Sequence, residues 1–421
     1  MMNKEHFDHH FRKIARVLVL GMPVFLVLGA GAADTALSLV AILFLVHSLV
    51  RHDWSWLGEA WVRVCLLVWG WLFVASAFAV DPGASLGTAV TWFRFFVFAA
   101  ALQFWVMDRE WLILSIKFTG LVVILVAIDA VIQYFWGQDL FGMTPPNGTL
   151  DRLTGPMRKM VVGMYVSKLM YLPLVAFLFW AVRKKRLSGI LGVIVAFLVC
   201  ATAVVLSGER TATVLMIVGL LVAALTLRPA RRYLVIGSVA TALLAGVLFM
   251  SLPNLVNRQL GQTLSTLHQL RASPYGQLWL GGISIGLRHP ITGVGLKNFR
   301  LVCDDETQGA LSEKDVWRCG THPHNYYIQW FCETGIVGLM LFLLLMGTLV
   351  RTVWPTLSHE NWWLGGIVAT LAIHAWPLGS TGSFFNNWNS AILWFPFGLA
   401  VAGMRFIGPI DPGLNEEGGN T

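Results

Sequence analysis

Long apolar runs alternate with short polar segments over nearly the whole chain. A helix needs roughly 20 apolar residues to cross the hydrocarbon core of a bilayer. Runs of this kind predict twelve membrane-spanning helices, at 14–31, 34–50, 62–80, 88–106, 111–136, 161–182, 188–206, 210–227, 233–251, 326–349, 362–380 and 388–406. The pattern therefore predicts an all-α integral membrane protein, with a single polytopic membrane domain over residues 1–421.

The first apolar run allows a second interpretation. Basic residues precede it, and it ends at Ala30-Gly31-Ala32, which is typical of a signal peptide and its cleavage site. The next apolar run follows at once, which favours a helical hairpin instead. Either interpretation leaves the topology of the remaining spans unchanged.

One long polar stretch, 252–325, separates the ninth and tenth predicted spans. Its first part predicts an amphipathic helix, because apolar residues recur at spacings of three and four: Val256, Leu260, Leu264, Leu267 and Leu270. Such a helix lies on the membrane or caps the bundle, either as packing or facing a substrate. About 75 residues without a clear core are too few for a second domain. We therefore expect a large loop that forms part of a site within the membrane domain.

The composition supports this class. Of the 421 residues, 56% are hydrophobic and 12% are charged, whereas soluble domains carry about 25% charged residues. The 19 Trp also fit a membrane protein, since Trp favours the membrane–water interface. The net charge of +8 does not indicate nucleic acid, because the basic residues form short clusters between apolar runs. Membrane lipids are the expected surroundings.

Basic residues also predict the orientation, because cytoplasmic loops carry an excess of Lys and Arg. The clusters 183–186 and 228–232 fall on the same side of the predicted bundle as the basic N-terminus, Arg51, Arg351 and Arg405. We expect that side to be the cytoplasm, with both termini inside and the loop 252–325 outside.

Many cations nevertheless fall on the outer side: Arg152, Arg158, Lys159, Arg210, Arg258, Arg271, Arg288, Lys297, Arg300, Lys314 and Arg318. Arg158 and Arg210 lie at the outer ends of spans, and Arg94 lies just inside one. Cations in such places are costly and usually face a cavity or a partner. Converging guanidinium groups suit an anionic lipid head group, because they bind phosphate with two hydrogen bonds. Snorkelling and ion pairing are the alternative.

Asp129 is the main acidic residue inside a predicted span. It could act as a base, but a buried carboxylate more often pairs with a cation. Lys168 and Arg94 are available, so we expect such a pair.

The segment Thr321-His322-Pro323-His324-Asn325 precedes the tenth span. Histidine suits general base catalysis near neutral pH, and a helix N-terminus favours the neutral imidazole. His324 is thus a candidate base, with a helix-capping role as the alternative. The two histidines are two positions apart, which suits a metal poorly, and no cysteine or carboxylate cluster completes a set of ligands. We expect neither a metal nor a cofactor, since nucleotide-binding glycine motifs are also missing from the sequence.

Cys303 and Cys319 both fall in the outer loop, sixteen positions apart. Disulfides form in oxidising compartments, so we expect these two residues to be joined. Three further cysteines lie in predicted spans and are interpreted as small apolar residues.

Several motifs resemble those of the O-antigen ligase and polymerase superfamily. They are the run 289–299 (HPITGVGLKNF), His324-Asn325 followed by Gln329, Glu333, Gly335 and Gly338, and the turn 206–211 (LSGERT). The motifs lie within 200–345, and the topology of the whole chain is similar to that of the family. The family's essential His matches His324, and its Arg at the mouth of a span matches Arg210.

The resemblance implies a glycosyltransferase in the bacterial inner membrane with its active site facing the periplasm. The donor is a glycan on undecaprenyl diphosphate. A ligase transfers this glycan to lipid A–core oligosaccharide, whereas a polymerase extends the glycan on its carrier; the ligase is the first interpretation. Members are generally metal-independent.

In the mechanism that follows, Arg210 binds the diphosphate and His324 deprotonates an acceptor hydroxyl, so that one displacement inverts the anomeric configuration. The family's loop Arg has no clear match, because Tyr275 stands one turn before Trp279. We therefore expect the substrate-binding residues among Arg94, Arg158, Lys159, Arg271, Arg288, His322 and Asn325. A transporter of an anionic lipid is a third interpretation, although no halving of the chain supports it.

Overall fold

The computed structural model describes residues 4–148, 150–306, 319–358 and 361–406, and all regular structure within them is helical. The helices of the first half are α1 (Lys4–Leu28), α2 (Ala30–Arg51), α3 (Ala60–Ala77), α4 (Pro82–Ala101), α5 (Arg109–Trp136), α6 (Val162–Leu169), α7 (Tyr171–Arg183), α8 (Leu187–Leu206) and α9 (Arg210–Thr226). Those of the second half are α10 (Arg231–Ser251), α11 (Pro253–Val256), α12 (Gln262–His268), α13 (Pro274–Arg288), α14 (Phe299–Glu306), α15 (Tyr326–Val353), α16 (Gly366–His374) and α17 (Asn387–Met404). Lys314 and Arg318 lie outside the described residues.

Each of the twelve predicted spans contains a helix. Seven helices of the described residues are long and apolar enough to cross a membrane, or eight if α6 and α7 count as one bent span. This result supports the all-α membrane class, and the number twelve stays a prediction. The predicted span 161–182 is not straight, because α6 and α7 meet at an angle of 42°. Pro173 in the first turn of α7 explains the break, since its ring clashes with the carbonyl group four residues earlier.

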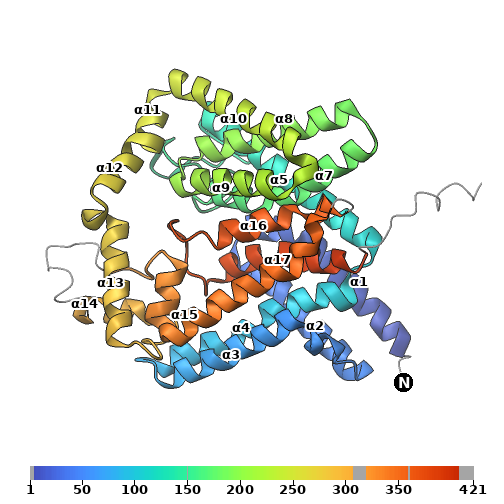
Figure 1. The fold of residues 1–421 in the computed structure, drawn as a ribbon, viewed down its shortest axis with the longest axis vertical. Helices are drawn as coiled ribbons and strands as arrows, with labels where there is room; N and C mark the ends of the chain where they lie inside the picture. Colours follow the sequence, from blue (N-terminus) through green and yellow to red (C-terminus); the bar gives the residue numbers. More distant parts are fainter. Residues whose placement is uncertain (1–3, 149, 307–318, 359–360, 407–421) are drawn as a thin grey trace, which may run out of the picture.

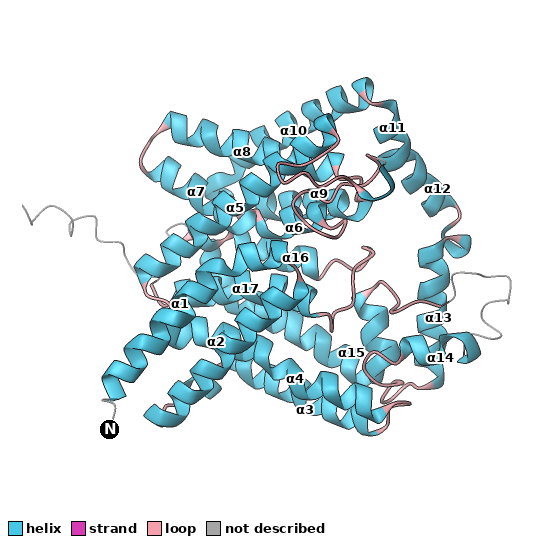
Figure 2. Ribbon diagram, turned by 180° about the vertical axis from the view of Figure 1, so that it is seen from behind, coloured by secondary structure: helices cyan, strands magenta, loops and turns pink. Residues whose placement is uncertain are grey.

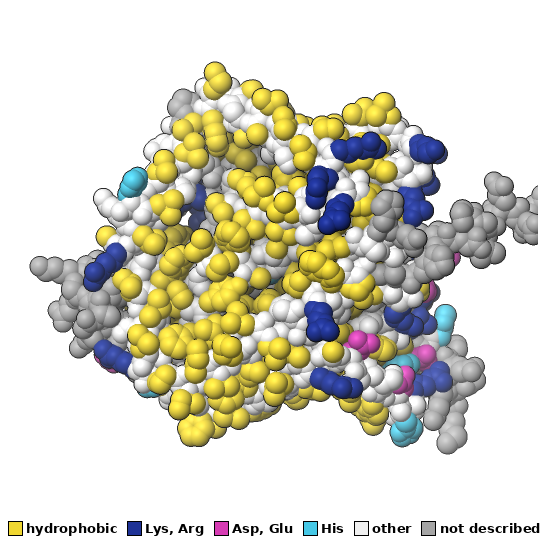
Figure 3. Space-filling view, in the orientation of Figure 1, with side chains coloured by type: hydrophobic (Ala, Val, Ile, Leu, Met, Phe, Trp, Pro, Cys, Tyr) yellow, Lys and Arg dark blue, Asp and Glu magenta, His cyan; other side chains and the backbone are white. Residues whose placement is uncertain are grey.

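The helices form two groups (Figure 1). In one group α1 packs on α2, α3 on α4 and α15 on α3; in the other, α5 and α7 pack on α8. Helix α16 lies against α9, and α17 packs on α4. The space-filling view shows a broad apolar surface over the middle of the molecule, with Lys and Arg side chains towards its two ends (Figure 3). Such a distribution suits a bilayer around the middle.

A strap of short helices, α11 to α13, runs down one end of the molecule between the two groups (Figures 1 and 2). The predicted amphipathic helix falls within this strap. Its leucines, Leu260, Leu264, Leu267 and Leu270, are exposed rather than packed on the bundle. An apolar face of this kind suits a helix at the membrane surface, which is one of the two predicted placements.

The distal part of the strap is fastened to α15 by backbone hydrogen bonds. Gly335 interrupts α15 with a φ of 70°, and the turn 290–295 docks into the break. Val294 N donates to the carbonyl of Cys332 at 2.9 Å, and Ile336 N donates to the carbonyl of Pro290 at 2.7 Å. These bonds satisfy polar groups that the helix break leaves open, which an apolar environment requires.

The predicted disulfide is present. Cys303 and Cys319 are bonded, with Cα atoms 5.3 Å apart, whereas Cys65, Cys200 and Cys332 are buried free thiols. The bond ties α14 to the segment that leads into α15.

Candidate active site

Asn325 determines where α15 begins. Its side-chain oxygen accepts hydrogen bonds from the backbone N–H groups of Tyr327 and Ile328, at 3.0 and 3.2 Å, which is the usual N-cap geometry. Its side-chain nitrogen donates to the carbonyl of Pro377 at 2.6 Å. Both ends of the amide are therefore engaged within the protein, which indicates a supporting role for a residue that the sequence suggested as a substrate ligand.

The two histidines share one backbone acceptor. His324 Nδ1 lies 3.1 Å, and His322 Nε2 lies 3.3 Å, from the carbonyl oxygen of Thr381. Thr381 N donates in return to the carbonyl of His324 at 2.8 Å. The two rings are 4.0 Å apart between centroids. A loop between α16 and α17 thus holds both imidazoles in place.

These bonds define the tautomer of His324. A carbonyl oxygen can only accept, so Nδ1 carries the proton and Nε2 presents a lone pair. No hydrogen bond within the described residues engages Nε2, which leaves it available to a substrate. Burial lowers the pKa of His324, and the hydrogen bond to Thr381 opposes that shift. Burial, together with the neighbouring His324, lowers the pKa of His322 to about 4, so both rings are neutral near pH 7.

Further contacts from α15 fix the same loop. Gln329 donates to the hydroxyl of Ser383 at 2.8 Å and accepts from Phe384 N at 2.9 Å, and the hydroxyl of Tyr327 donates to the carbonyl of Ala375. The Thr381 carbonyl, which accepts from both histidines, therefore belongs to a loop that several hydrogen bonds hold in place.

Arg210 is the first residue of α9, as the motif suggested. Its Nη1 donates to the carbonyl of Gln262 at 2.8 Å and to the hydroxyl of Thr266 at 3.2 Å. The guanidinium group therefore connects the mouth of α9 to α12 in the strap, while its other nitrogens make no hydrogen bond with the described residues. Among the described residues, Arg210 forms no ion pair with Glu209 or Asp129.

Two other arginines gather around Arg210. Arg258 donates through Nε to the carbonyl of Gly208 at 3.2 Å, and its pKa is lowered by burial and then by the charges of Arg152, with Arg210 also contributing. Arg152 donates to the carbonyl of Met160 at 3.1 Å. Both belong to the outer cations predicted from the sequence, but their positions in the chain do not set them apart as those of Arg158 and Arg210 do.

The buried carboxylate of this cluster is Glu209. Its Oε1 accepts from Gly163 N at 2.7 Å. Burial raises the pKa of Glu209 to about 7, although the hydrogen bond from Gly163 and the charge of Arg152 act in the opposite direction. Asp151 is a second carboxylate that acts on Arg258. Two carboxylates, one of them weakly ionised, among three arginines still leave an excess of positive charge, which suits an anionic ligand.

Tyr275 connects the arginine cluster to the histidines. Its ring lies 6.0 Å from that of His324, edge to face, and it is close enough to influence the pKa of Arg258. The α16–α17 loop, which carries Thr381, also approaches the start of α9. A Cβ placed on Gly379 of this loop would lie 3.5 Å from the side chain of Thr211, the residue after Arg210. The structure thus brings His324 and the cluster of Arg152, Arg210 and Arg258 to one region.

The remaining predicted ligands lie elsewhere or are engaged. Arg158 and Lys159 are exposed in the α5–α6 loop, and Arg271 is exposed between α12 and α13. Arg288 ends α13, thirteen residues or about 20 Å along the helix from Tyr275. Their roles stay predictions.

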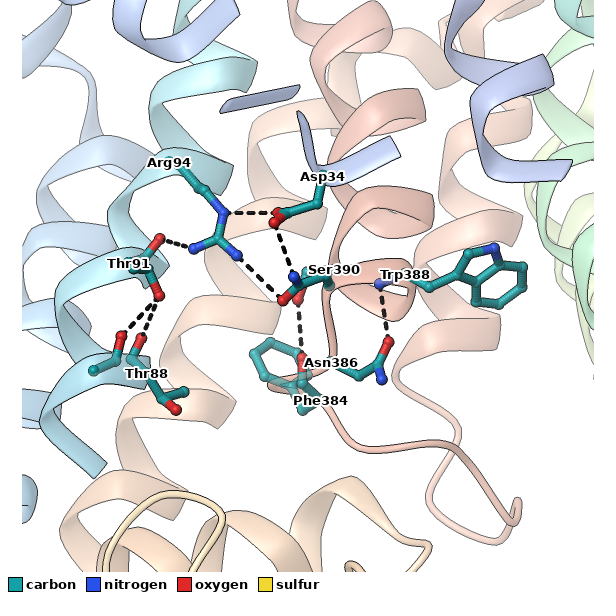
Figure 4. A network of polar contacts seen from close by, with 10 residues as sticks. Asp34, Thr88, Thr91, Arg94, Phe384, Asn386, Trp388 and Ser390 are labelled. Carbon is teal, nitrogen blue, oxygen red and sulfur yellow. Dashed lines mark hydrogen bonds and ion pairs between the residues drawn. The ribbon is translucent and has the colours of Figure 1, made fainter. Parts of the chain in front are cut away.

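Arg94 belongs to a network that joins three helices (Figure 4). Its Nε pairs with Asp34 of α2 at 2.8 Å, and its Nη2 donates to Asn387 of α17 at 3.1 Å.

The predicted pairing of Asp129 with Arg94 or Lys168 is wrong: Asp129 accepts from Leu140 N at 2.8 Å and so supports the loop after α5. A backbone N–H group of that loop binds the carboxylate in place of a cation. The prediction considered only side chains within the spans and therefore missed this donor.

Within the described residues, no group of three or more His, Cys, Asp or Glu side chains could hold a metal ion.

Comparison with known families adds a match over residues 195–343, to the family described as O-antigen ligase. The matched segment includes Arg210, Arg258 and His324 and thus the centre of the site. It confirms the resemblance that the motifs indicated. No curated protein matches the chain.

Proposed function

We propose, from the match of residues 195–343 to the O-antigen ligase family, that the protein is an O-antigen ligase. In this proposal it transfers a glycan from undecaprenyl diphosphate to a sugar hydroxyl of lipid A–core oligosaccharide. The reaction takes place at the periplasmic face of the bacterial inner membrane, and both termini of the chain lie in the cytoplasm.

The observation that carries the proposal is the geometry of His324. Its Nδ1 donates to the carbonyl of Thr381, so Nε2 is the basic nitrogen. In the proposed reaction, Nε2 removes the proton from the acceptor hydroxyl. The acceptor oxygen forms a bond to the anomeric carbon as the bond from that carbon to the diphosphate breaks, and undecaprenyl diphosphate leaves with the electron pair. A single displacement of this kind inverts the anomeric configuration.

The leaving group needs positive charge, which Arg152, Arg210 and Arg258 can supply. Each guanidinium group presents a planar fork of donors that matches phosphate oxygens. Preorganised donors of this type stabilise charge that develops in the transition state. Arg158, Lys159 and Arg271 are exposed and would act by attracting the anionic donor to this face.

The experiment is transfer by the purified protein in liposomes, with a carrier-linked glycan as donor. A ligase forms a conjugate when lipid A–core is added. Lengthening of the carrier-linked glycan instead would show a polymerase, which the same family match allows. A third outcome, lipid movement across the bilayer without transfer in wild type, would identify a transporter and reject the enzyme.

A further inference from the structure

A pair of cations, Lys297 and Arg300, lies outside the cluster of three arginines. Lys297 precedes α14 and Arg300 is in its first turn, where Arg300 Nε donates to the carbonyl of Lys297 at 3.2 Å. Arg300 is exposed and Lys297 is half-buried. Apart from that bond, neither cationic group has a hydrogen-bonding or ion-pairing partner among the described residues.

The backbone of Lys297 is unusual in a way that favours a functional role. Its φ is +60°, a region that residues with a side chain seldom occupy. Such conformations persist where surrounding contacts impose them, and they cluster at ligand sites. Here Asn298 imposes the turn, since its side-chain nitrogen donates to the carbonyls of Val294 at 3.1 Å and Asp81 at 3.2 Å.

Arg300 is within electrostatic range of the histidine pair. Its charge contributes to lowering the pKa of His322, whose ring is 4.0 Å from that of His324. Arg258, by contrast, interacts electrostatically with Tyr275, whose ring packs against that of His324. Different neighbours of His324 therefore lead to the two sets of cations. The arginine cluster comes from the α5–α6 loop, the start of α9 and the segment between α11 and α12, whereas Lys297 and Arg300 belong to the start of α14. Helices α12 and α14 lie apart (Figure 1).

Nearby carboxylates do not neutralise this pair. Asp34 already pairs with Arg94. Glu333 is buried, accepts from Gln329 at 3.0 Å and interacts electrostatically with both Lys297 and Arg300. A single carboxylate can offset only one of the two positive charges, and burial lowers the pKa of Lys297 more than Glu333 raises it. A half-buried cation beside an exposed one, without an ion-pair partner, would gain from an anionic ligand.

We propose that Lys297 and Arg300 form an anion site for the acceptor, and that the acceptor is a saccharide with a phosphate or carboxylate group near the hydroxyl that His324 activates. This inference rests on the proposed function, because it assigns the arginine cluster to the donor and leaves this pair to the acceptor. The same chemistry would bind the head group of an acidic phospholipid, so the experiment must separate the two sources.

The test compares Lys297→Gln and Arg300→Gln with wild type in phosphatidylcholine liposomes, using a phosphorylated acceptor and its dephosphorylated form. We expect KM for the phosphorylated acceptor to rise about tenfold or more in each variant, the amount expected from one charge-assisted hydrogen bond. KM for the donor, and transfer to the dephosphorylated acceptor, should not change. Arg300→Lys should restore part of the affinity. Arg109→Gln, at an exposed position that starts α5, is the matched control.

Equal loss with both acceptors in folded variants would show a structural role and overturn the inference, as would no loss with either. Binding is measured separately by calorimetry on His324→Ala protein, so that a failure of transfer does not decide this question. Binding of the phosphorylated acceptor that depends on Lys297 and Arg300 supports the site even if no transfer occurs. Binding of phosphatidylglycerol alone, with the same dependence, would identify a lipid site and overturn the acceptor assignment.

Discussion

At the scale of single residues, the hydrogen bond from His324 to Thr381 leads to a specific pH dependence. Only the neutral imidazole can accept a proton, and burial keeps the pKa of His324 below its ordinary value of 6.5. Activity should therefore be complete near pH 7 and fall as the pH drops through a value below 6.5. His324→Ala should lower the rate by about 10²–10⁴ and abolish this acid limb. Transfer rates over a pH series, with size-exclusion profiles as the folding control, measure both effects. Near-normal turnover in folded His324→Ala would exclude this residue as the base.

Arg210 allows charge to be separated from geometry. If its guanidinium group binds phosphate with two hydrogen bonds, Lys cannot replace it. We expect Arg210→Lys to lose on the order of 10²–10³ in rate while its melting temperature changes little, and Arg210→Ala to lose nearly all activity.

The matched control for Arg210 is Thr266→Ala, which removes a partner of Nη1 but keeps the guanidinium group. It should retain most of the activity. If Arg210→Lys were nearly as active as wild type, or if Thr266→Ala were as damaging as Arg210→Lys, the arginine would serve to hold α12 rather than phosphate.

The sequence was sufficient to single out His324 and Arg210, because each stands in a motif at the mouth of an apolar run. It could not reveal Thr381 as the support of His324, since a backbone carbonyl acts there and any residue type provides one. Arg152 and Arg258 stand out from the other outer cations only in the structure, where the strap packs against the α8–α9 turn. The substrate role of Asn325 stays a prediction, whereas its N-cap role could have been inferred from its position before α15.

At the scale of elements, hydropathy located the helices well, because the bilayer imposes length and apolar character on each span. It did not predict that the span 161–182 bends, although Pro173 offered a local signal. Nor did it predict the break in α15. Glycines occur throughout membrane helices, and only the docked turn explains why Gly335 leaves the helical conformation.

The disulfide also belongs to this scale. Closing a loop of sixteen residues contributes about 3 kcal/mol in the chain-entropy model. In denatured, unreduced protein purified from an oxidising compartment, we expect alkylation of three thiols, those of Cys65, Cys200 and Cys332. After reduction, mass spectrometry should detect two more. Alkylation of all five thiols before reduction would contradict the bond, and Cys303→Ser should lower the melting temperature.

At the scale of the whole molecule, the proposed orientation can be tested without any substrate. Lys159 and Lys184 are both exposed, and the charge pattern predicts that they lie on opposite sides of the membrane. In a variant with the free cysteines replaced, Lys159→Cys should react with a membrane-impermeant maleimide added to intact spheroplasts. Lys184→Cys should react only after permeabilisation. The reverse pattern would place His324 in the cytoplasm, away from the proposed substrates.

The docking of the turn 290–295 into α15 limits which sequence changes this protein can tolerate. A Cβ on Gly335 would lie 1.9 Å from the carbonyl oxygen of Ile291, and one on Gly293 would lie 2.4 Å from the carbonyl carbon of Glu333. Both obstacles are main-chain atoms, so no smaller neighbouring side chain can make room. Suppressor screens starting from Gly335→Ala or Gly293→Ala should therefore return true revertants and no second-site rescue.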